Sequence, residues 1–81
     1  MNTKSRAARW MEAAEKAERS LQELVDVQSE YSDWFENLPE GLQQAPAGEK
    51  LQAIVDLDLE SAHDAVEEAL GVDLPRGFGR D

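Results

Sequence analysis

The sequence predicts an all-α protein built as a helical hairpin, in which one or two shorter helices pack back against a long N-terminal helix. Three observations predict this fold class. Residues 5–37 contain neither proline nor glycine and are rich in Ala, Glu, Leu, Arg and Gln, which favour helices. Apolar residues in this stretch recur at alternating steps of three and four, the spacing of one helix face. No segment shows the strict alternation of a strand, and 81 residues suffice for one domain, so we expect residues 1–81 to form a single helical domain.

The long helix is predicted over residues 5–37 and carries an apolar seam with the heptad spacing of a coiled coil. The seam consists of Ala7, Trp10, Ala14, Ala17, Leu21, Leu24, Gln28, Tyr31, Phe35 and Leu38. Gln28 is its one polar member, and we expect it to fix the register of the helix pairing. Four more apolar residues widen the seam: Met11, Val25, Val27 and Trp34. A stripe of this width predicts that the helix contacts more than one partner helix.

Pro39 and Gly41 end the long helix, because the residue before a proline is pushed out of the helical region. Residues 38–48 are predicted to be a loop, and residues 71–81 an irregular tail. Between them, residues 49–70 are helical and form either two helices or one helix bent near residues 56–58.

Residues 49–71 carry sequence signals for the inward-facing side chains, the start and the end of the predicted helices. Leu51 is expected to point inward from the first helical part of residues 49–70, and Val66 from the second helical part. Asp58 or Ser61 has the chemistry of an N-cap for the second part. Gly71 suits the position that follows a helix C-terminus.

The length of the predicted N-terminal helix indicates that the chain associates with a second copy. A helix of about 32 residues is about 48 Å long, whereas a compact chain of this size is only about 30 Å across. We therefore expect the returning segment to leave the N-terminal third of the long helix uncovered, and the protein to form a homodimeric bundle, most simply an antiparallel dimer. The predicted dimer interface consists of Ala7, Trp10, Met11, Ala14, Ala17 and Leu21.

The net charge of −10 is concentrated in one part of the chain. Residues 1–19 carry five basic and three acidic residues, a net charge of +2. Residues 20–75 carry fourteen acidic residues and only Lys50 as a base, a net charge of −13. Direct binding to nucleic acid is excluded, because phosphates require clustered Lys and Arg.

The acidic residues of the long helix form an outward row opposite the apolar seam. They lie toward the C-terminal end of the helix, where its dipole disfavours each carboxylate by about 0.3–1 kcal/mol at low salt. No Lys or Arg lies between Arg19 and Lys50 to offset them. This placement favours a functional acidic surface over a role in folding. The candidate partner-binding residues are Glu23, Asp26, Glu30, Asp33, Glu36, Glu40, Asp56, Asp58, Glu60, Asp64, Glu67 and Glu68.

The composition argues against an enzyme. The chain has no cysteine, which excludes a disulfide framework, a thiolate zinc site and a cysteine nucleophile. His63 is the only histidine, and Asp64 beside it points to a different face of the predicted helix, so no catalytic dyad follows. We expect no catalytic residues, no cofactor and no bound metal.

Parts of the sequence resemble small acidic helical proteins of phages and prophages. The resemblance runs from Gln28 onward and is carried by Trp34 and by the segments QSEY (28–31), NLPE (37–40), EKL (49–51), DLDL (56–59) and LPRGFGRD (74–81). It implies a viral or mobile-element setting, where short acidic helical proteins include anti-CRISPR proteins and other nuclease inhibitors that mimic DNA. No specific motif of those inhibitors is present, so the resemblance assigns no site residue.

The leading functional hypothesis is a phage-type inhibitor that binds a basic, nucleic-acid-binding host protein by DNA-like charge mimicry. Two alternatives stay open: an assembly protein or oligomerising adaptor with a merely solvated acidic face, and an acidic antitoxin for a basic toxin. The apolar runs are too short to span a membrane, and the start Met1-Asn2-Thr3-Lys4 is not that of a signal peptide. We therefore expect the protein in the cytoplasm of a bacterial host cell.

Overall fold

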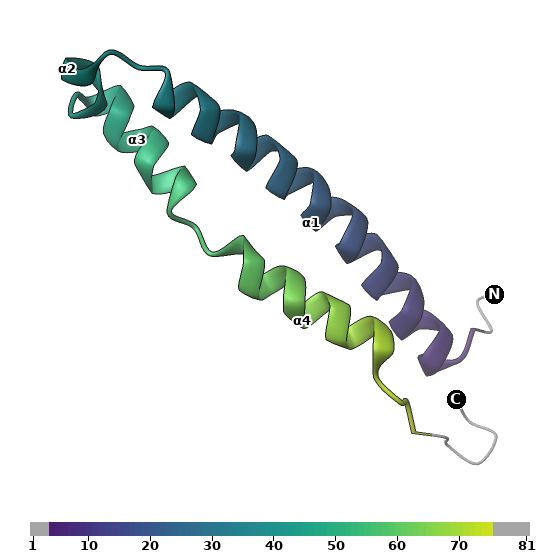
Figure 1. The fold of residues 1–81 in the computed structure, drawn as a ribbon. Helices are drawn as coiled ribbons and strands as arrows, with labels where there is room; N and C mark the ends of the chain where they lie inside the picture. Colours follow the sequence, from purple (N-terminus) through teal and green to yellow (C-terminus); the bar gives the residue numbers. More distant parts are fainter. Residues whose placement is uncertain (1–3, 76–81) are drawn as a thin grey trace.

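The computed structural model describes residues 4–75, and every regular element in that part of the chain is a helix. The elements in order are α1 (Arg6–Glu36), α2 (Glu40–Gln43), α3 (Pro46–Val55) and α4 (Leu59–Gly71). The chain turns around at α2, and α3 and α4 run back along α1, one after the other (Figure 1). This confirms the predicted all-α hairpin.

The bounds of α1 follow its capping residues. Ser5 is the N-cap, and its hydroxyl oxygen accepts a hydrogen bond from the backbone N–H of Ala8 at 3.0 Å. At the other end, Asn37 donates through its side-chain amide to the carbonyl oxygen of Asp33 at 2.9 Å. The predicted range of 5–37 therefore counts both caps as helix.

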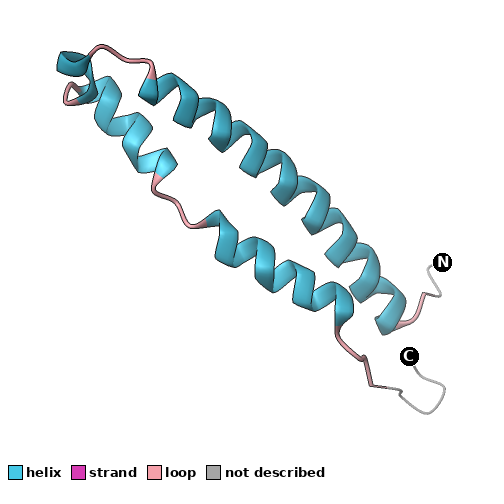
Figure 2. Cartoon of the chain, in the orientation of Figure 1, coloured by secondary structure: helices cyan, strands magenta, loops and turns pink. Residues whose placement is uncertain are grey.

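The predicted loop at residues 38–48 is more helical than expected. It contains the short helix α2, and α3 begins at Pro46 rather than at residue 49. A proline suits the first turn of a helix, because its missing N–H has no partner there and its φ angle is already helical. Figure 2 shows how little irregular chain remains in this turn.

Gly48 lets α3 pack against the end of α2. It is buried, and a Cβ atom at this position would lie 2.2 Å from the carbonyl oxygen of Gln43 and 2.6 Å from that of Leu42. Both obstacles are backbone atoms, which a side-chain rotation cannot move. The tight turn therefore requires glycine at this position.

Helices α3 and α4 are separate, which decides between the two alternatives for residues 49–70. The side-chain amide of Gln28 donates to the carbonyl oxygens of Ile54 and Leu57, both at 2.9 Å, and so binds α1 to the junction. Asp58 caps α4, accepting from the backbone N–H of Ser61 at 3.1 Å. Gly71 is the last residue of α4 rather than the residue after it.

The register of α1 against α3 and α4 differs from the predicted seam. The row with the least exposure has the same alternating steps but is shifted around the helix, so that Met11, Glu18 and Val25 replace Trp10, Ala17 and Leu24. Its members are Ala7, Met11, Ala14, Glu18, Leu21, Val25, Gln28, Ser32 and Phe35. The wide apolar stripe offered two adjacent rows, and the returning helices cover only one of them.

The molecule is flat and elongated, with extents of 63 × 25 × 15 Å and a radius of gyration of 19.0 Å. A compact chain of this length has a radius of gyration of about 12 Å. A thickness of 15 Å corresponds to one layer of helices. Side chains in a single layer are covered from one side only, which explains why Ala14 and Leu51 are the only buried hydrophobic residues of the described part.

The expectation that the N-terminal third of α1 is uncovered within the chain is wrong. Figure 1 shows α4 ending close to the start of α1, and the indole N–H of Trp10 donates to the carbonyl oxygen of Ala69 at 2.8 Å. The physical reason is that the returning helices are nearly as long as α1. Residues 46–71 span about 39 Å when helical, close to the roughly 46 Å of α1, because the break between α3 and α4 takes only residues 56–58.

Candidate functional site: two faces and two acidic edges

A single layer of helices has two broad faces, and in this molecule they differ in chemistry. One face has a groove between α1 and the returning helices that is lined by Leu24, Val27, Gln28, Tyr31, Ile54, Leu57 and Leu59. We call this the apolar face. The groove on the opposite side is lined by Gln22, Val25, Gln28, Leu59, Glu60 and His63, and continues past Glu18, Arg19 and Glu67. We call this the polar face.

The apolar face exposes large hydrophobic side chains to solvent. Among them, Trp10 is 46% exposed, Leu24 53%, Val27 39% and Trp34 56%. The rings of Tyr31 and Trp34 stack with centroids 6.1 Å apart and an angle of 18° between their planes. Exposed aromatic and aliphatic side chains in one continuous row are typical of an interaction surface.

The row continues the helical spacing along α1. It comprises Trp10, Ala13, Ala17, Ser20, Leu24, Val27, Tyr31 and Trp34, again at alternating steps of three and four. Ala62, Ala65 and Ala69 follow the same steps on α4 and lie on the same side, since Ala69 receives the hydrogen bond from Trp10. This part of the face is therefore uncharged on both helices.

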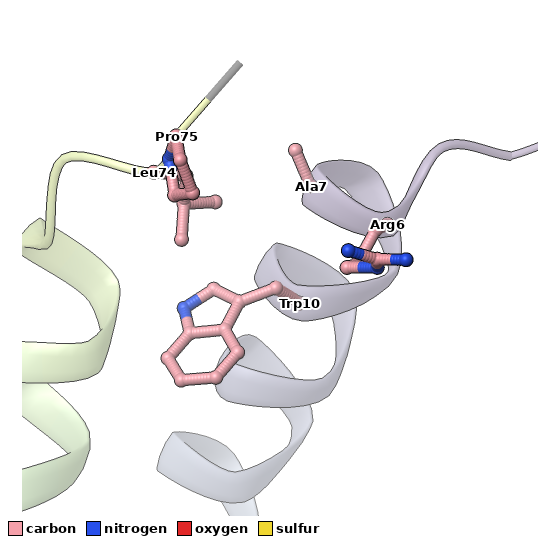
Figure 3. A pocket seen from close by; sticks show the side chains of 5 residues that line it. All are labelled: Arg6, Ala7, Trp10, Leu74 and Pro75. Carbon is pink, nitrogen blue, oxygen red and sulfur yellow. The ribbon is translucent and has the colours of Figure 1, made fainter. Parts of the chain in front are cut away.

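A small hollow of about 220 Å³ lies at the Trp10 end, lined by Arg6, Ala7, Trp10, Leu74 and Pro75. In Figure 3 the indole of Trp10 extends from α1 toward Leu74 and Pro75, which follow α4. Most of the surface that lines this hollow is apolar. The hollow adjoins the apolar face through Trp10.

The twelve predicted acidic residues are all exposed, but they do not form one surface. Glu23 and Glu30 lie on the outer edge of α1, about half a turn from its inward row, and Asp26 and Asp33 lie between that edge and the polar face. Asp64 and Glu68 lie on the outer side of α4. Glu60 and Glu67 line the polar face between these edges. The acidic side chains thus occupy two edges and the polar face.

None of the twelve pairs with a lysine or arginine within residues 4–75. Asp26 accepts from the side-chain amide of Gln22 at 3.1 Å, and Asp56 from that of Gln52 at 2.6 Å. His63 lies 3.6 Å from the carboxylate of Glu67. Most of the negative charge is therefore available to a partner.

Asp58 differs from the other eleven because its carboxylate has a structural role. The hydroxyl of Ser61 donates to it at 2.7 Å, and the backbone N–H of the same residue donates at 3.1 Å. These hydrogen bonds to the ionised form, that from the hydroxyl above all, lower the pKa of Asp58 below its usual 3.8. We therefore assign Asp58 to the cap of α4 rather than to the partner-binding surface.

The predicted dimer interface divides between two environments. Ala14 is buried under the returning helices, and Ala7, Met11 and Leu21 are partly covered, so these four belong to the contacts within the chain. Trp10 and Ala17 are exposed on the apolar face. The prediction placed these residues together because the sequence does not show on which side of the wide stripe the returning helices pack.

The described residues contain no group of three or more His, Asp or Glu side chains arranged to hold a metal ion. None of the helices in residues 4–75 combines the length and apolar character needed to cross a bilayer. No protein family, characterised protein or solved structure matches this chain.

Proposed function

We propose that this protein is a non-enzymatic binding protein whose acidic edges and polar face occupy a basic, nucleic-acid-binding surface of another protein and so inhibit it. The observation that carries the proposal is the arrangement of unpaired carboxylates. Acidic residues lie on the C-terminal half of the outer edge of α1, on the outer edge of α4 and on the polar face, and none of the twelve has a basic partner within residues 4–75.

Asp26 and Asp33 on α1 and Asp64 and Glu68 on α4 form two short rows of negative charge, one after the other along the elongated molecule, which resemble the phosphates of a nucleic acid in their charge. A basic groove that binds nucleic acid presents Lys and Arg to such rows, and complementary charge favours fast and salt-sensitive association. The resemblance to phage proteins makes a host defence nuclease the first partner class to test. An antitoxin would use the same surface against a basic toxin.

The proposal is tested by capture of partners from a bacterial lysate on the immobilised protein, followed by elution with duplex DNA and, separately, with salt. The test variant neutralises four residues of the edges and polar face: Asp26→Asn, Asp33→Asn, Glu60→Gln and Glu67→Gln. The control variant neutralises four exposed acids outside the predicted set: Glu12→Gln, Glu15→Gln, Glu49→Gln and Asp73→Asn. Both variants change the net charge equally.

We expect the wild type and the control variant to retain a nucleic-acid-binding protein that duplex DNA and high salt both release. The test variant should retain much less of it. A captured protein that DNA does not displace, or that the test variant binds as well as the control does, would contradict charge mimicry.

The apolar face supports the alternative of an assembly protein or adaptor, because a merely solvated acidic protein needs no exposed row of aromatic and aliphatic side chains. This alternative depends on the exposed apolar row and not on Asp26, Asp33, Glu60 and Glu67, so the two functions are separable by mutation.

A further inference from the structure

We propose that the apolar face is a homodimer interface, on which α1 of one chain pairs antiparallel with α1 of a second copy to complete a two-layer bundle. Three observations favour a second copy of this chain as the partner that covers the apolar face. They are the surface area left exposed, the order of side chains along the exposed row of α1, and the charged residues that border this row.

The first reason is surface area. The solvent-accessible surface of the chain is 6624 Å². A compact protein of this length exposes about 4,800 Å², so the excess is about 1,800 Å². An interface of standard size takes about 800 Å² from each partner, which is less than half of the excess. A second layer of helices removes this surface from water and turns one layer into a bundle with an interior.

The second reason is the order of side chains along the row. Trp10 lies at one end and Leu24 and Val27 at the other, and the residues between them, Ala13, Ala17 and Ser20, are small. Small residues at the middle of a helix pair let the two backbones approach closely. An antiparallel pair centred on them sets Trp10 against Val27 of the second copy and Ala13 against Leu24, so large and small side chains interdigitate.

The third reason is charge. Arg9, Lys16, Glu23 and Glu30 border the row at intervals of seven residues, two basic residues followed by two acidic ones. A parallel pair would set these residues opposite Ala14, Leu21 and Gln28 of the second copy, which are uncharged, and would form no charged pairs. An antiparallel pair opposes Arg9 to Glu30 and Lys16 to Glu23 of the second copy, and one register satisfies both pairs. That register is also the one that sets Trp10 against Val27.

The same arrangement leaves the polar face and the outer edge of α4 pointing away from the interface. Asp26 and Asp33 also stay outside it, since they lie farther round α1 than Glu23 and Glu30 do. The dimer takes Glu23 and Glu30 from the twelve acidic residues but none of the four that the test variant of the proposed function neutralises, so either proposal can fail without the other.

The proposal is tested by sedimentation velocity across a range of concentrations, with circular dichroism to check the helix content. Leu24→Glu introduces a charge on the apolar face at a side chain that is already 53% exposed, so the chain's own packing is preserved. Ser29→Glu is the matched control, because it adds the same charge at an exposed position of α1 outside the row.

We expect the wild type and Ser29→Glu to sediment as dimers. Leu24→Glu should sediment as a helical monomer, with a dissociation constant raised by about a hundredfold or more. A wild type that is monomeric at all concentrations, or a dimer that Leu24→Glu leaves intact, would overturn the proposal.

Orientation is tested by a charge swap. Arg9→Glu and Glu30→Arg should each weaken the dimer, because each places like charges opposite one another, and the double variant should recover most of the wild-type affinity. Single substitutions that have no effect, or a double variant weaker than either single one, would overturn the antiparallel pairing.

Discussion

Three polar side chains take over a role that basic residues have in many helices. The last carbonyl groups of a helix have no partner within it, and Lys or Arg nearby often satisfies them. Here no basic residue lies in the last turn of α1, α3 or α4. Gln43 donates to Phe35 at 3.3 Å, Gln28 to Ile54 at 2.9 Å and Trp10 to Ala69 at 2.8 Å. Each bond also joins one helix to another, so the ends of the helices fix the register of the hairpin.

Gln28→Leu should lower the free energy of unfolding by about 0.5–1.5 kcal/mol, because the carbonyl oxygens of Ile54 and Leu57 each lose the side-chain donor and keep only backbone N–H donors. Urea denaturation at one fixed protein concentration measures the change. Gln22→Leu is the control, since Gln22 is exposed and bonds only to Asp26 on its own helix, and it should change stability by less than about 0.5 kcal/mol. Equal effects of the two substitutions would argue against the junction bond.

Gly48→Ala should destabilise the protein by about 1–3 kcal/mol, because the added methyl group meets backbone oxygens that cannot move without opening the α2–α3 turn. Gly41→Ala in the neighbouring helix α2 is the control, since nothing lies within 4 Å of its added Cβ. We expect that substitution to be neutral or slightly stabilising, as alanine favours helices over glycine. Thermal unfolding followed by circular dichroism compares the two variants.

At the scale of elements, α1 carries two adjacent apolar rows. One row contacts α3 and α4, and the other is the exposed apolar row from Trp10 to Trp34. A helix needs two adjacent apolar rows when it contacts partners on two sides. Helix α4, by contrast, contributes Leu59 and three alanines to the apolar side, so most of the large apolar side chains of that face belong to α1.

The cap of α4 should make stability depend on pH. Asp58 has a lowered pKa in the folded protein, so its carboxylate stabilises the fold above the unfolded value near 3.8, and this contribution is lost as the pH falls through the lower, folded value. Asp58→Ala should therefore lower the melting temperature at pH 6, and the difference from wild type should shrink below about pH 4.

Asp58→Asn serves as the control, because asparagine caps a helix without titrating. It should melt close to wild type at pH 6. A difference between wild type and Asp58→Ala that stays constant from pH 6 to the acid limit would contradict the role of the ionised carboxylate.

At the scale of the whole molecule, shape and charge distribution belong together. The flat layer of 63 × 25 × 15 Å has one uncharged face along α1 and α4, and acidic residues on its edges and opposite face. Burying the uncharged face places the negative charge on the outside of an assembly. Such an arrangement satisfies the hydrophobic effect and keeps carboxylates in water.

If the apolar face is buried between two copies, folding and association are coupled. The midpoint of thermal unfolding should then rise with protein concentration over about a hundredfold range, because mass action favours the dimer. Circular dichroism at several concentrations measures it. The midpoint of Leu24→Glu should be lower and independent of concentration, and a concentration-independent wild-type midpoint would contradict the coupling.

Sequence reasoning predicted the elements well, because helix formation depends on local signals. The absence of proline and glycine placed α1, Pro39 ended it, and Asp58 was one of two candidates for the cap of α4. The exposure of all twelve acidic residues also follows from composition, since charges avoid the interior. Local signals in the sequence could not predict α2, because this four-residue helix depends on its packing against α3 at Gly48.

The sequence by itself determined that this chain forms a long apolar-striped helix, a return helix and an acidic exterior. Only the tertiary structure decided which row of that stripe is covered, since Trp10, Leu24 and Val27 have the same helical spacing as Met11, Val25 and Gln28. Spacing places residues on a helix, but the side on which another helix packs depends on contacts between segments far apart in the sequence. Here those contacts include the bonds from Gln28 to the α3–α4 junction and from Trp10 to Ala69, and they leave the second row exposed.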